Sequence, residues 1–203
     1  CGILLLLRAK KMFTFRENSF TIGYGVIYIR IAMMKRCLRC GGMEIRKATK
    51  EEMSEVWRLG KVDSNEATER FFREQIGSGN ADFWTIDDNG ILLGELYVFH
   101  KLADEEFADG KEKVYLCAFR VRKDRRGQGL GTMLMKKVLR ELKDSGFRAA
   151  TIGVDETEEA NIRLYEHLGF TEKIKDCYED PCAMDDEMRQ ERCSCFWLLQ
   201  KRL

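Results

Sequence analysis

The sequence predicts an α/β fold in which helices cover both faces of a central mixed sheet. Three observations support this prediction. Stretches with the two-residue spacing of strands alternate with stretches of helical spacing over residues 43–203. Hydrophobic residues make up 44% of the chain and charged residues 34%, which suits a folded domain with a core. One proline among 203 residues argues against long Pro-rich linkers.

The first 42 residues differ in charge from the rest of the chain. They contain eight Lys and Arg residues and one acid, Glu17, whereas residues 43–203 contain 27 basic and 33 acidic residues. A basic segment of this kind is typical of a targeting arm, of a nucleic-acid-binding arm, or of a leader outside the domain. We expect the last: a basic leader at 1–42, which an extended reading frame would produce, and a domain at 43–203. The functional protein would then start at Met43, with Met33 and Met34 as alternatives.

The spacing of apolar residues predicts the order of the elements. The domain is expected to begin with a strand at 44–48, followed by helices at 49–60 and 64–76. The turn Asn89-Gly90 indicates a β-hairpin made from residues 82–86 and 91–99. The later elements are a strand at 111–121, a helix at 132–146, a strand at 147–154, a helix at 155–170 and strands at 170–176 and 194–203. The expected order is therefore β-α-α-β-β-β-α-β-α-β-β.

The cysteines and the apolar runs argue against several classes of protein. A structural zinc site needs four converging ligands, but Cys37 and Cys40 form one pair in the leader and the chain has only two histidines. We therefore expect no metal, reduced thiols in the cytoplasm, and Cys117 packed in its strand as a small hydrophobe. The apolar run after Cys1 is too short for a membrane span, and Arg30 interrupts the next one. We expect neither a membrane nor a nucleic acid as a partner.

The segment RRGQGLG, residues 125–131, places three glycines between a strand and a helix. Free backbone N–H groups at a helix start bind anions, and glycine keeps Cβ atoms away from the ligand. The segment alone fits a phosphate cradle and a packing turn equally well. A P-loop would need a lysine where Thr132 stands, and the glycine spacing is one residue short of a dinucleotide-binding fingerprint.

A second motif helps to decide between a phosphate cradle and a packing turn. Arg126, Gly129 and Gly131 fill the pattern [Q/R]-x-x-G-x-[G/A], and the segment NIRLYEHLGF, residues 161–170, follows about 30 residues later. With these two motifs in this strand–helix order, residues 43–203 resemble the GNAT superfamily of N-acetyltransferases. The resemblance implies a GNAT-like acyl-CoA N-acyltransferase fold, acetyl-CoA as co-substrate and no metal.

The resemblance also assigns roles around the loop. In that family the loop wraps the pyrophosphate of coenzyme A, and the end of the preceding strand pairs with the pantetheine arm. This implies that Phe119 and Val121 bind the arm through their main chain, and that Arg125 or Arg126 adds charge to the loop. The implied loop residues are Arg125, Arg126, Gly127, Gln128, Gly129, Leu130, Gly131 and Thr132.

Three further residues are candidates for the site. Tyr165 matches the family tyrosine beside the coenzyme sulfur, where its hydroxyl would protonate the leaving thiolate; a tyrosine packed against the sheet is the alternative. Asn161, one helical turn earlier, would reach the coenzyme arm or instead cap the helix. The strand VYLCAFRV lacks the carboxylate that many relatives carry, so Glu95 is the candidate general base. A solvent-facing Glu95, with water as the base, is the other interpretation.

The resemblance implies acetyl transfer to a primary amine by direct attack in a ternary complex. Acidic loops at 102–110 and 175–188 would rim the acceptor side and favour a small cationic amine, unless they are plain solvated surface. The alternatives are a protein N-terminal or lysine acetyltransferase and a catalytically silent CoA-binding module. The sequence leaves undecided whether the chain forms a homodimer. The aromatic residues that would line the acceptor pocket, or else pack in the core, are Trp57, Phe71, Phe72, Phe83 and Trp84.

Overall fold

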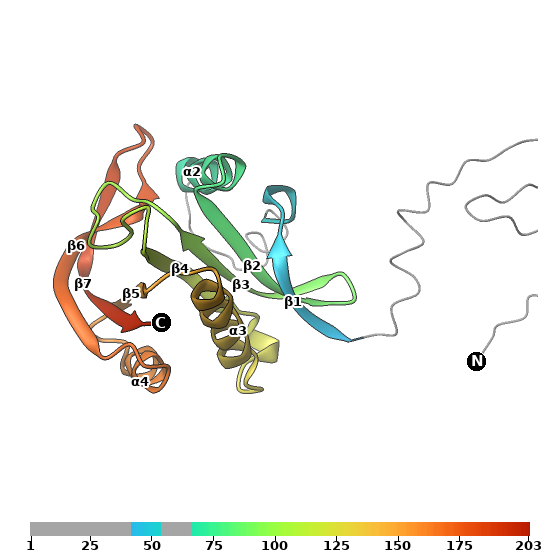
Figure 1. Ribbon diagram of the computed structural model, residues 1–203. Helices are drawn as coiled ribbons and strands as arrows, with labels where there is room; N and C mark the ends of the chain where they lie inside the picture. Colours follow the sequence, from blue (N-terminus) through green and yellow to red (C-terminus); the bar gives the residue numbers. More distant parts are fainter. Residues whose placement is uncertain (1–41, 54–65) are drawn as a thin grey trace, which may run out of the picture. The chain divides into compact units, whose positions relative to one another are not determined.

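The computed structural model describes residues 42–53 and 66–203, and these residues form one sheet with helices on both of its faces (Figure 1). The sheet has seven strands in the order β1-β2-β3-β4-β5-β7-β6. Neighbouring strands are antiparallel except β4 and β5, which run parallel. The predicted mixed sheet is therefore confirmed.

The observed elements follow the predicted order over the described residues. Residues 50–53 are helical, and the rest of the helix expected at 49–60 lies outside the described residues. The strands are β1 (Met43–Ala48), β2 (Ala81–Asp88), β3 (Ile91–Phe99), β4 (Lys113–Val121), β5 (Ala149–Asp155), β6 (Glu172–Met184) and β7 (Gln190–Arg202). The helices are α2 (Glu66–Gly77), the short 3-10 helix η2 (Lys123–Arg125), α3 (Leu130–Asp144) and α4 (Glu159–His167).

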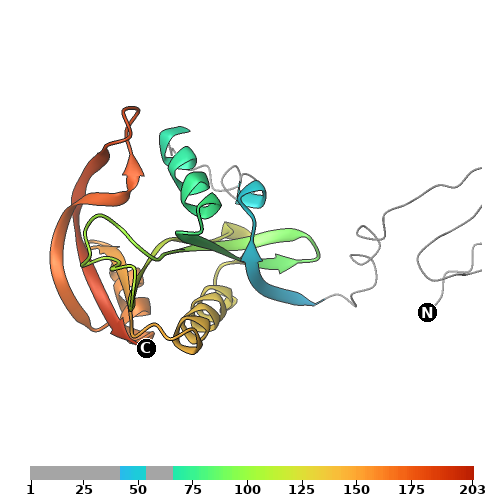
Figure 2. The ribbon, with the colours of Figure 1, turned by 45° about the horizontal axis from the view of Figure 1, so that its top comes forward.

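The sheet divides the core into two layers, each covered by helices. Helix α2 covers one face, and α3 and α4 lie on the other (Figures 1 and 2). The α3 layer is built on Leu134, Met135 and Val138, whose side chains are fully buried. The α2 layer contains an aromatic group in which the Phe72 ring meets the Tyr97 and Phe99 rings edge to face. Helix spacing on α3 and alternation on the strands predict these two layers.

A bulge in β4 changes which of its side chains face which layer. Ala118 and Phe119 together lie opposite the single residue Leu96 of β3, and Ala118 adopts a φ of 48°. Before this bulge the odd-numbered Cys117 packs on the α2 side, and after it the odd-numbered Phe119 packs on the α3 side. An extra residue in one strand shifts the alternation in this way. The bulge thus turns Phe119 toward α3.

Strands β4 and β5 pair only along their first halves. The parallel register runs from Lys113 opposite Ala149 to Leu116 opposite Ile152, and no further pair joins the two strands in the described residues. Beyond that point β4 continues to Val121 beside β3, while β5 continues to Asp155 beside β7. The sheet therefore opens between two central strands, where main-chain groups are left facing a gap.

The expectation of a loop at 175–188 is wrong, because β6 continues through Pro181 to Met184 before the chain turns into β7. Strand β6 is the edge of the sheet and pairs with β7 alone. A proline is tolerated on an edge strand, since its missing N–H removes no bond to a second neighbour. The acidic run therefore belongs largely to a strand.

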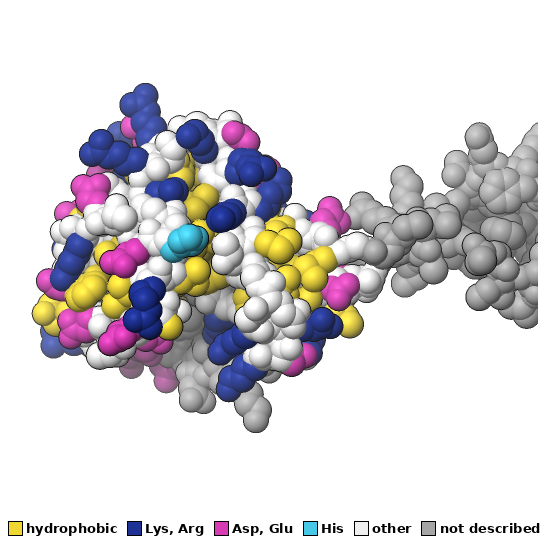
Figure 3. Space-filling model, turned by 90° about the horizontal axis from the view of Figure 1, so that it is seen from below, with side chains coloured by type: hydrophobic (Ala, Val, Ile, Leu, Met, Phe, Trp, Pro, Cys, Tyr) yellow, Lys and Arg dark blue, Asp and Glu magenta, His cyan; other side chains and the backbone are white. Residues whose placement is uncertain are grey.

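The surface carries charges of both signs. On the face shown in Figure 3, Lys and Arg side chains are intermixed with Asp and Glu, and apolar side chains lie between them. In the described part of the chain, no helix combines the length and the apolar composition needed to cross a membrane.

The α3 layer gives a direct test of the core. Leu134 is fully buried on α3, whereas its neighbour Met133 is 52% exposed. We expect Leu134→Ala to lower the free energy of unfolding by about 2–5 kcal/mol, because it leaves a cavity beneath the sheet. Met133→Ala should change it by no more than about 0.5 kcal/mol. Urea denaturation of both variants measures the difference, and equal effects would contradict the assigned orientation of α3.

Candidate active site

The glycine loop before α3 combines two backbone requirements. Gly127 and Gly129 have φ values of 74° and 77°, a region that side chains rarely permit, and the space where their Cβ atoms would lie is open. Gly131 is different: a Cβ there would lie 2.8 Å from Cζ of Phe119 on β4. Two glycines thus shape the loop, and the third lets the helix approach the strand.

The start of α3 leaves main-chain donors pointing out of the helix. Gly129 is the N-cap residue and no side chain caps the helix. The first intrahelical bond of the cap region runs from the Met133 N–H to the Gly129 carbonyl at 3.0 Å. The N–H groups of the residues before Met133 therefore have no acceptor within the helix, and the helix dipole adds positive potential there. This arrangement is suited to an anion.

A pocket of about 650 Å³ lies in front of these donors, and we call it the loop pocket. Three arginines belong to its wall, Arg120, Arg125 and Arg126. The Nε of Arg126 donates to the Val121 carbonyl at 3.0 Å, which ties the loop to the end of β4. The predicted loop residues all line this pocket except Gln128, whose side chain is exposed elsewhere.

The end of β4 presents main-chain groups to the gap between β4 and β5. The Arg122 N–H donates to the Leu93 carbonyl of β3 at 2.9 Å. Main-chain groups alternate in direction along a regular strand, so those of Val121 face the opposite side, away from β3. Val121 and Phe119 both line the loop pocket. An extended ligand has donors and acceptors available along this edge.

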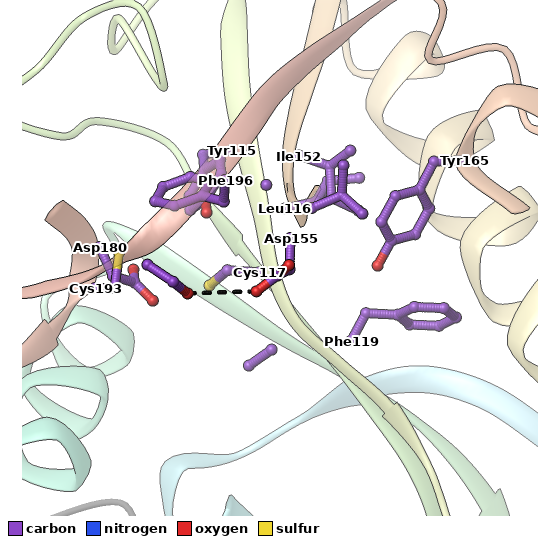
Figure 4. Close-up of a pocket in the computed structure, with 14 residues that line it drawn as sticks. Tyr115, Leu116, Cys117, Phe119, Ile152, Asp155, Tyr165, Asp180, Cys193 and Phe196 are labelled. Carbon is purple, nitrogen blue, oxygen red and sulfur yellow. Dashed lines mark hydrogen bonds between the residues drawn. The ribbon is translucent and has the colours of Figure 1, made fainter. Parts of the chain in front are cut away.

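Tyr165 of α4 lies where the loop pocket meets a second pocket. Its side chain is 6% exposed, and its ring centroid lies 6.5 Å from that of Phe119 and 6.2 Å from that of Phe170. Burial, together with the nearby Glu158 carboxylate, raises the pKa of the Tyr165 hydroxyl well above its usual range. The phenol therefore keeps its proton at neutral pH. In Figure 4 the hydroxyl points into the pocket beside Phe119.

Asn161 also lines the loop pocket, one turn before Tyr165 on α4. Its side-chain amide donates to the carboxylate of Glu158, the N-cap residue of the same helix. The structure therefore places Asn161 at the pocket wall and also gives it a local partner at the helix start.

The second pocket, of about 260 Å³, lies between β4 and β5 where they separate; we call it the strand pocket (Figure 4). It shares Phe119 and Tyr165 with the loop pocket, so the two pockets adjoin at these side chains, and we call them together the cleft. Cys117 lines it as well; its half-buried thiol is free and packs against the α2 layer, as expected for a small hydrophobe in a strand. The remaining walls come from β5, β6 and β7, with Asp155, Asp180 and Ser194 as polar members.

Glu95 lies outside both pocket linings. The interpretation of Glu95 as a solvent-facing residue is wrong, because it is 1% exposed. Its carboxylate lies 2.5 Å from Nε of Arg120 and accepts a bond from the Tyr97 hydroxyl at 3.0 Å. Burial raises the pKa of Glu95, against the lowering effect of Arg120. Its observed contact is with Arg120, whose side chain borders the loop pocket.

Most acids of the expected acidic rim are already paired with cations. Lys175 of β6 lies against the carboxylates of Asp104 and Glu106, and Arg189 pairs with Asp185 and Glu187. Asp180, which lines the strand pocket, is an acid of this rim without a cationic partner among the described residues, and no sequence pattern distinguishes it from its acidic neighbours. The acidic run was visible in the sequence, but only the lining of the strand pocket shows which of its acids faces that pocket.

The aromatic residues proposed for the acceptor side mostly serve the core. Phe72, Phe83 and Trp84 are at most 6% exposed and pack in the two layers. Phe71 is half-buried and stacks on Phe99 with ring centroids 5.8 Å apart. Trp57 lies outside the described residues. None of the four described aromatics lines the cleft.

Comparison with known proteins defines the family. Residues 44–170, more than half of the chain, match the acetyltransferase (GNAT) family. The chain therefore belongs to this family, as its two motifs indicate.

Individual relatives match shorter parts. L-amino acid N-acyltransferase MnaT from Escherichia coli is 26% identical over 84 residues, 41% of this chain and 46% of that protein. Mycothiol acetyltransferase from Thermobispora bispora is 38% identical over 95 residues, 45% of this chain and 30% of that protein. The chain thus spans less than half the length of either relative. Among solved structures, yncA from Salmonella typhimurium, determined with its cofactor acetyl-CoA, shares the fold with a TM-score of 0.57 and 17% identity, over 80% of this chain and 94% of that one.

The ion pair behind the loop pocket supports a stability test. Glu95→Gln should lower the free energy of unfolding by about 1–3 kcal/mol, because it removes the charged partner of Arg120 at a buried position. Glu159→Gln removes the exposed partner of Arg163 on α4 and should cost no more than about 0.5 kcal/mol. Urea denaturation compares the two variants. A loss for Glu95→Gln no larger than for Glu159→Gln would show that the pair does not stabilise the site.

Proposed function

We propose that the protein transfers an acetyl group from acetyl-CoA to a primary amine, preferably a small cationic one, by direct attack in a ternary complex. The observation that carries the proposal is that the two pockets adjoin. Phe119 and Tyr165 belong to both pockets, so a donor held at the glycine loop and an acceptor in the strand pocket meet beside Tyr165. Family membership and the fold shared with an acetyl-CoA-bound structure support this assignment.

The loop pocket fits the donor in charge and in shape. The N–H groups at the start of α3 and the side chains of Arg125 and Arg126 would hold the pyrophosphate. The main chain of Phe119 and Val121 would bind the pantetheine arm as an added strand in the gap left by β5. Asn161 would contact the arm from α4.

The reaction requires one new bond and one broken bond. The amine nitrogen attacks the thioester carbonyl carbon, and the C–S bond breaks as the electron pair moves to sulfur. Tyr165 would donate its proton to the departing thiolate, for which its hydroxyl is protonated and faces the cleft. The proton lost by the amine would pass to water in the open cleft, because Glu95 is paired with Arg120 outside the pocket linings.

Cysteine usage supports a reducing compartment, and we propose the cytoplasm. The five cysteines in the described residues, Cys117, Cys177, Cys182, Cys193 and Cys195, are all free thiols. Free thiols are typical of cytoplasmic proteins.

The loop assignment predicts a selective loss of donor binding. Gly129→Ala should lower the free energy of unfolding by about 1–2 kcal/mol, because alanine is strained at the positive φ of this position. It should also weaken acetyl-CoA binding about tenfold or more, because it displaces the backbone N–H groups of the loop. Gly79→Ala is the matched control, because Gly79 has a φ of 78° and open space but does not line the cleft. Calorimetric titration with acetyl-CoA measures both. Equal affinities in the two variants would remove the loop from the donor site.

The role of Tyr165 predicts a loss of turnover. Tyr165→Phe keeps the ring in its packing site but removes the donated proton, so kcat should fall about 100-fold or more while acetyl-CoA affinity stays near wild type. Release of free thiol from acetyl-CoA in the presence of amines measures kcat.

The pH profile provides a second readout for the same residue. Because burial raises the Tyr165 pKa, wild-type turnover should not decline at about pH 10, where an ordinary tyrosine ionises. Unchanged kcat in Tyr165→Phe would rule out Tyr165 as the acid.

A further inference from the structure

The two ends of the cleft carry opposite charges. The loop pocket is bordered by Arg120, Arg125 and Arg126. Among the described residues, the strand pocket is lined by two carboxylates, Asp155 and Asp180, and by no Lys, Arg or His. A pocket of one sign attracts ligands of the other. The acceptor end of the cleft is therefore built for a cation, whereas the donor end is built for an anion.

The two carboxylates differ in their bonding. Asp155 accepts bonds from the Thr157 hydroxyl at 2.6 Å and the Thr157 N–H at 2.8 Å, and from Ser194 at 3.3 Å. Its oxygens thus serve the turn that follows β5 and a hydroxyl of β7. Asp180 accepts main-chain bonds, among them one from the Cys182 N–H at 2.8 Å, and no cation of the described residues acts on it. Asp180 is the carboxylate of the strand pocket with capacity left for a ligand.

The surroundings of Asp180 make a cationic partner favourable. It lies on β6 next to the buried Pro181 and Cys182, and Tyr115 and Cys117 of β4 are neutral neighbours. Burial raises the pKa of the Asp180 carboxyl, because the charged form lacks full hydration there. The neighbouring acids Asp104 and Asp185 have cationic partners from the chain itself. Asp180 would gain such a partner from a bound ligand.

Asp180 and Tyr165 stand on different walls of the strand pocket. In Figure 4, Asp180 and Tyr165 stand at opposite sides of the strand pocket, with Cys117 and Asp155 between them. The acetyl transfer is proposed beside Tyr165, on the other side of the pocket from this carboxylate. The carboxylate can hold a second charge on the same acceptor.

We propose, on the basis of the proposed function, that Asp180 binds a second cationic group of the acceptor. The acceptor class is then diamines, or amines that carry another cation several bonds from the reacting nitrogen. Asp180 acts as a specificity residue, and a single-charge amine of equal length lacks its partner.

Pairs of acceptors of equal length distinguish the binding of a second charge by Asp180 from a general effect on turnover. A homologous series of α,ω-diamines is compared with n-alkylamines of the same lengths by thiol release from acetyl-CoA. Wild-type kcat/KM should favour the diamine of best length by about 10-fold to 100-fold, the range of one charge-assisted hydrogen bond. Asp180→Asn should lower the value for that diamine to the level of the alkylamine and leave the alkylamine unchanged.

Glu179→Gln is the control, because it removes the same charge from the adjacent position on β6, where the side chain is exposed and pairs with Arg192 at 3.8 Å. It should keep the wild-type preference. If Asp180→Asn lowers kcat/KM equally for diamines and alkylamines, or leaves the preference for diamines unchanged, the role of Asp180 is refuted. The proposed acetyl transfer would not be affected by either result.

Binding without turnover tests the same residue independently. Calorimetric titration of diamines into the protein saturated with coenzyme A should show affinity in wild type and about tenfold or greater weakening in Asp180→Asn. If no amine releases thiol, the proposed function fails, and this titration still decides the role of Asp180. Equal diamine binding by both proteins would refute it.

Discussion

Beyond Leu116 and Ile152, strands β4 and β5 no longer pair, and every feature of the cleft depends on that separation. The bulge at Ala118 contributes to it by turning Phe119 toward α3, where the ring lies against Gly131. The same gap exposes main-chain groups at the end of β4 and admits Tyr165 from α4. A sheet that stayed fully paired would satisfy more hydrogen bonds but would have no central cleft.

The charges of the cleft would also separate the two proposed substrates. Arginines and helix N–H groups stand at the loop end, and Asp180 stands beyond Tyr165 at the other end. Each end therefore attracts the charge that the other repels. The buried Tyr165, whose hydroxyl keeps its proton, lies between the two ends, where the proposed reaction needs a proton donor without charge. In the proposed function, the glycine loop binds the donor and Asp180 on the edge strand β6 selects the acceptor.

The sequence predicted the parts of this site that depend on local backbone chemistry. Glycine at positive φ and a tyrosine on a helix face leave clear patterns, and the structure finds the loop and Tyr165 lining one pocket, while their roles stay predictions. The bulge at Ala118 left no pattern, because VYLCAFRV is apolar on both sides of it. Asp180 was hidden in an acidic run interrupted by Pro181, which resembled a loop. The burial of Glu95 could not be foreseen, because its partner, Arg120, lies on another strand.

Amide hydrogen exchange with and without saturating acetyl-CoA tests the central claim most directly, namely that the gap between β4 and β5 together with the glycine loop holds the donor. The account predicts new protection at the amides of residues 127–132 and at Phe119 and Val121, the groups that face the cleft. The β1–β2 pair, on the far side of the sheet from β5, should show no change. Protection confined to other segments, or none at saturation, would contradict it.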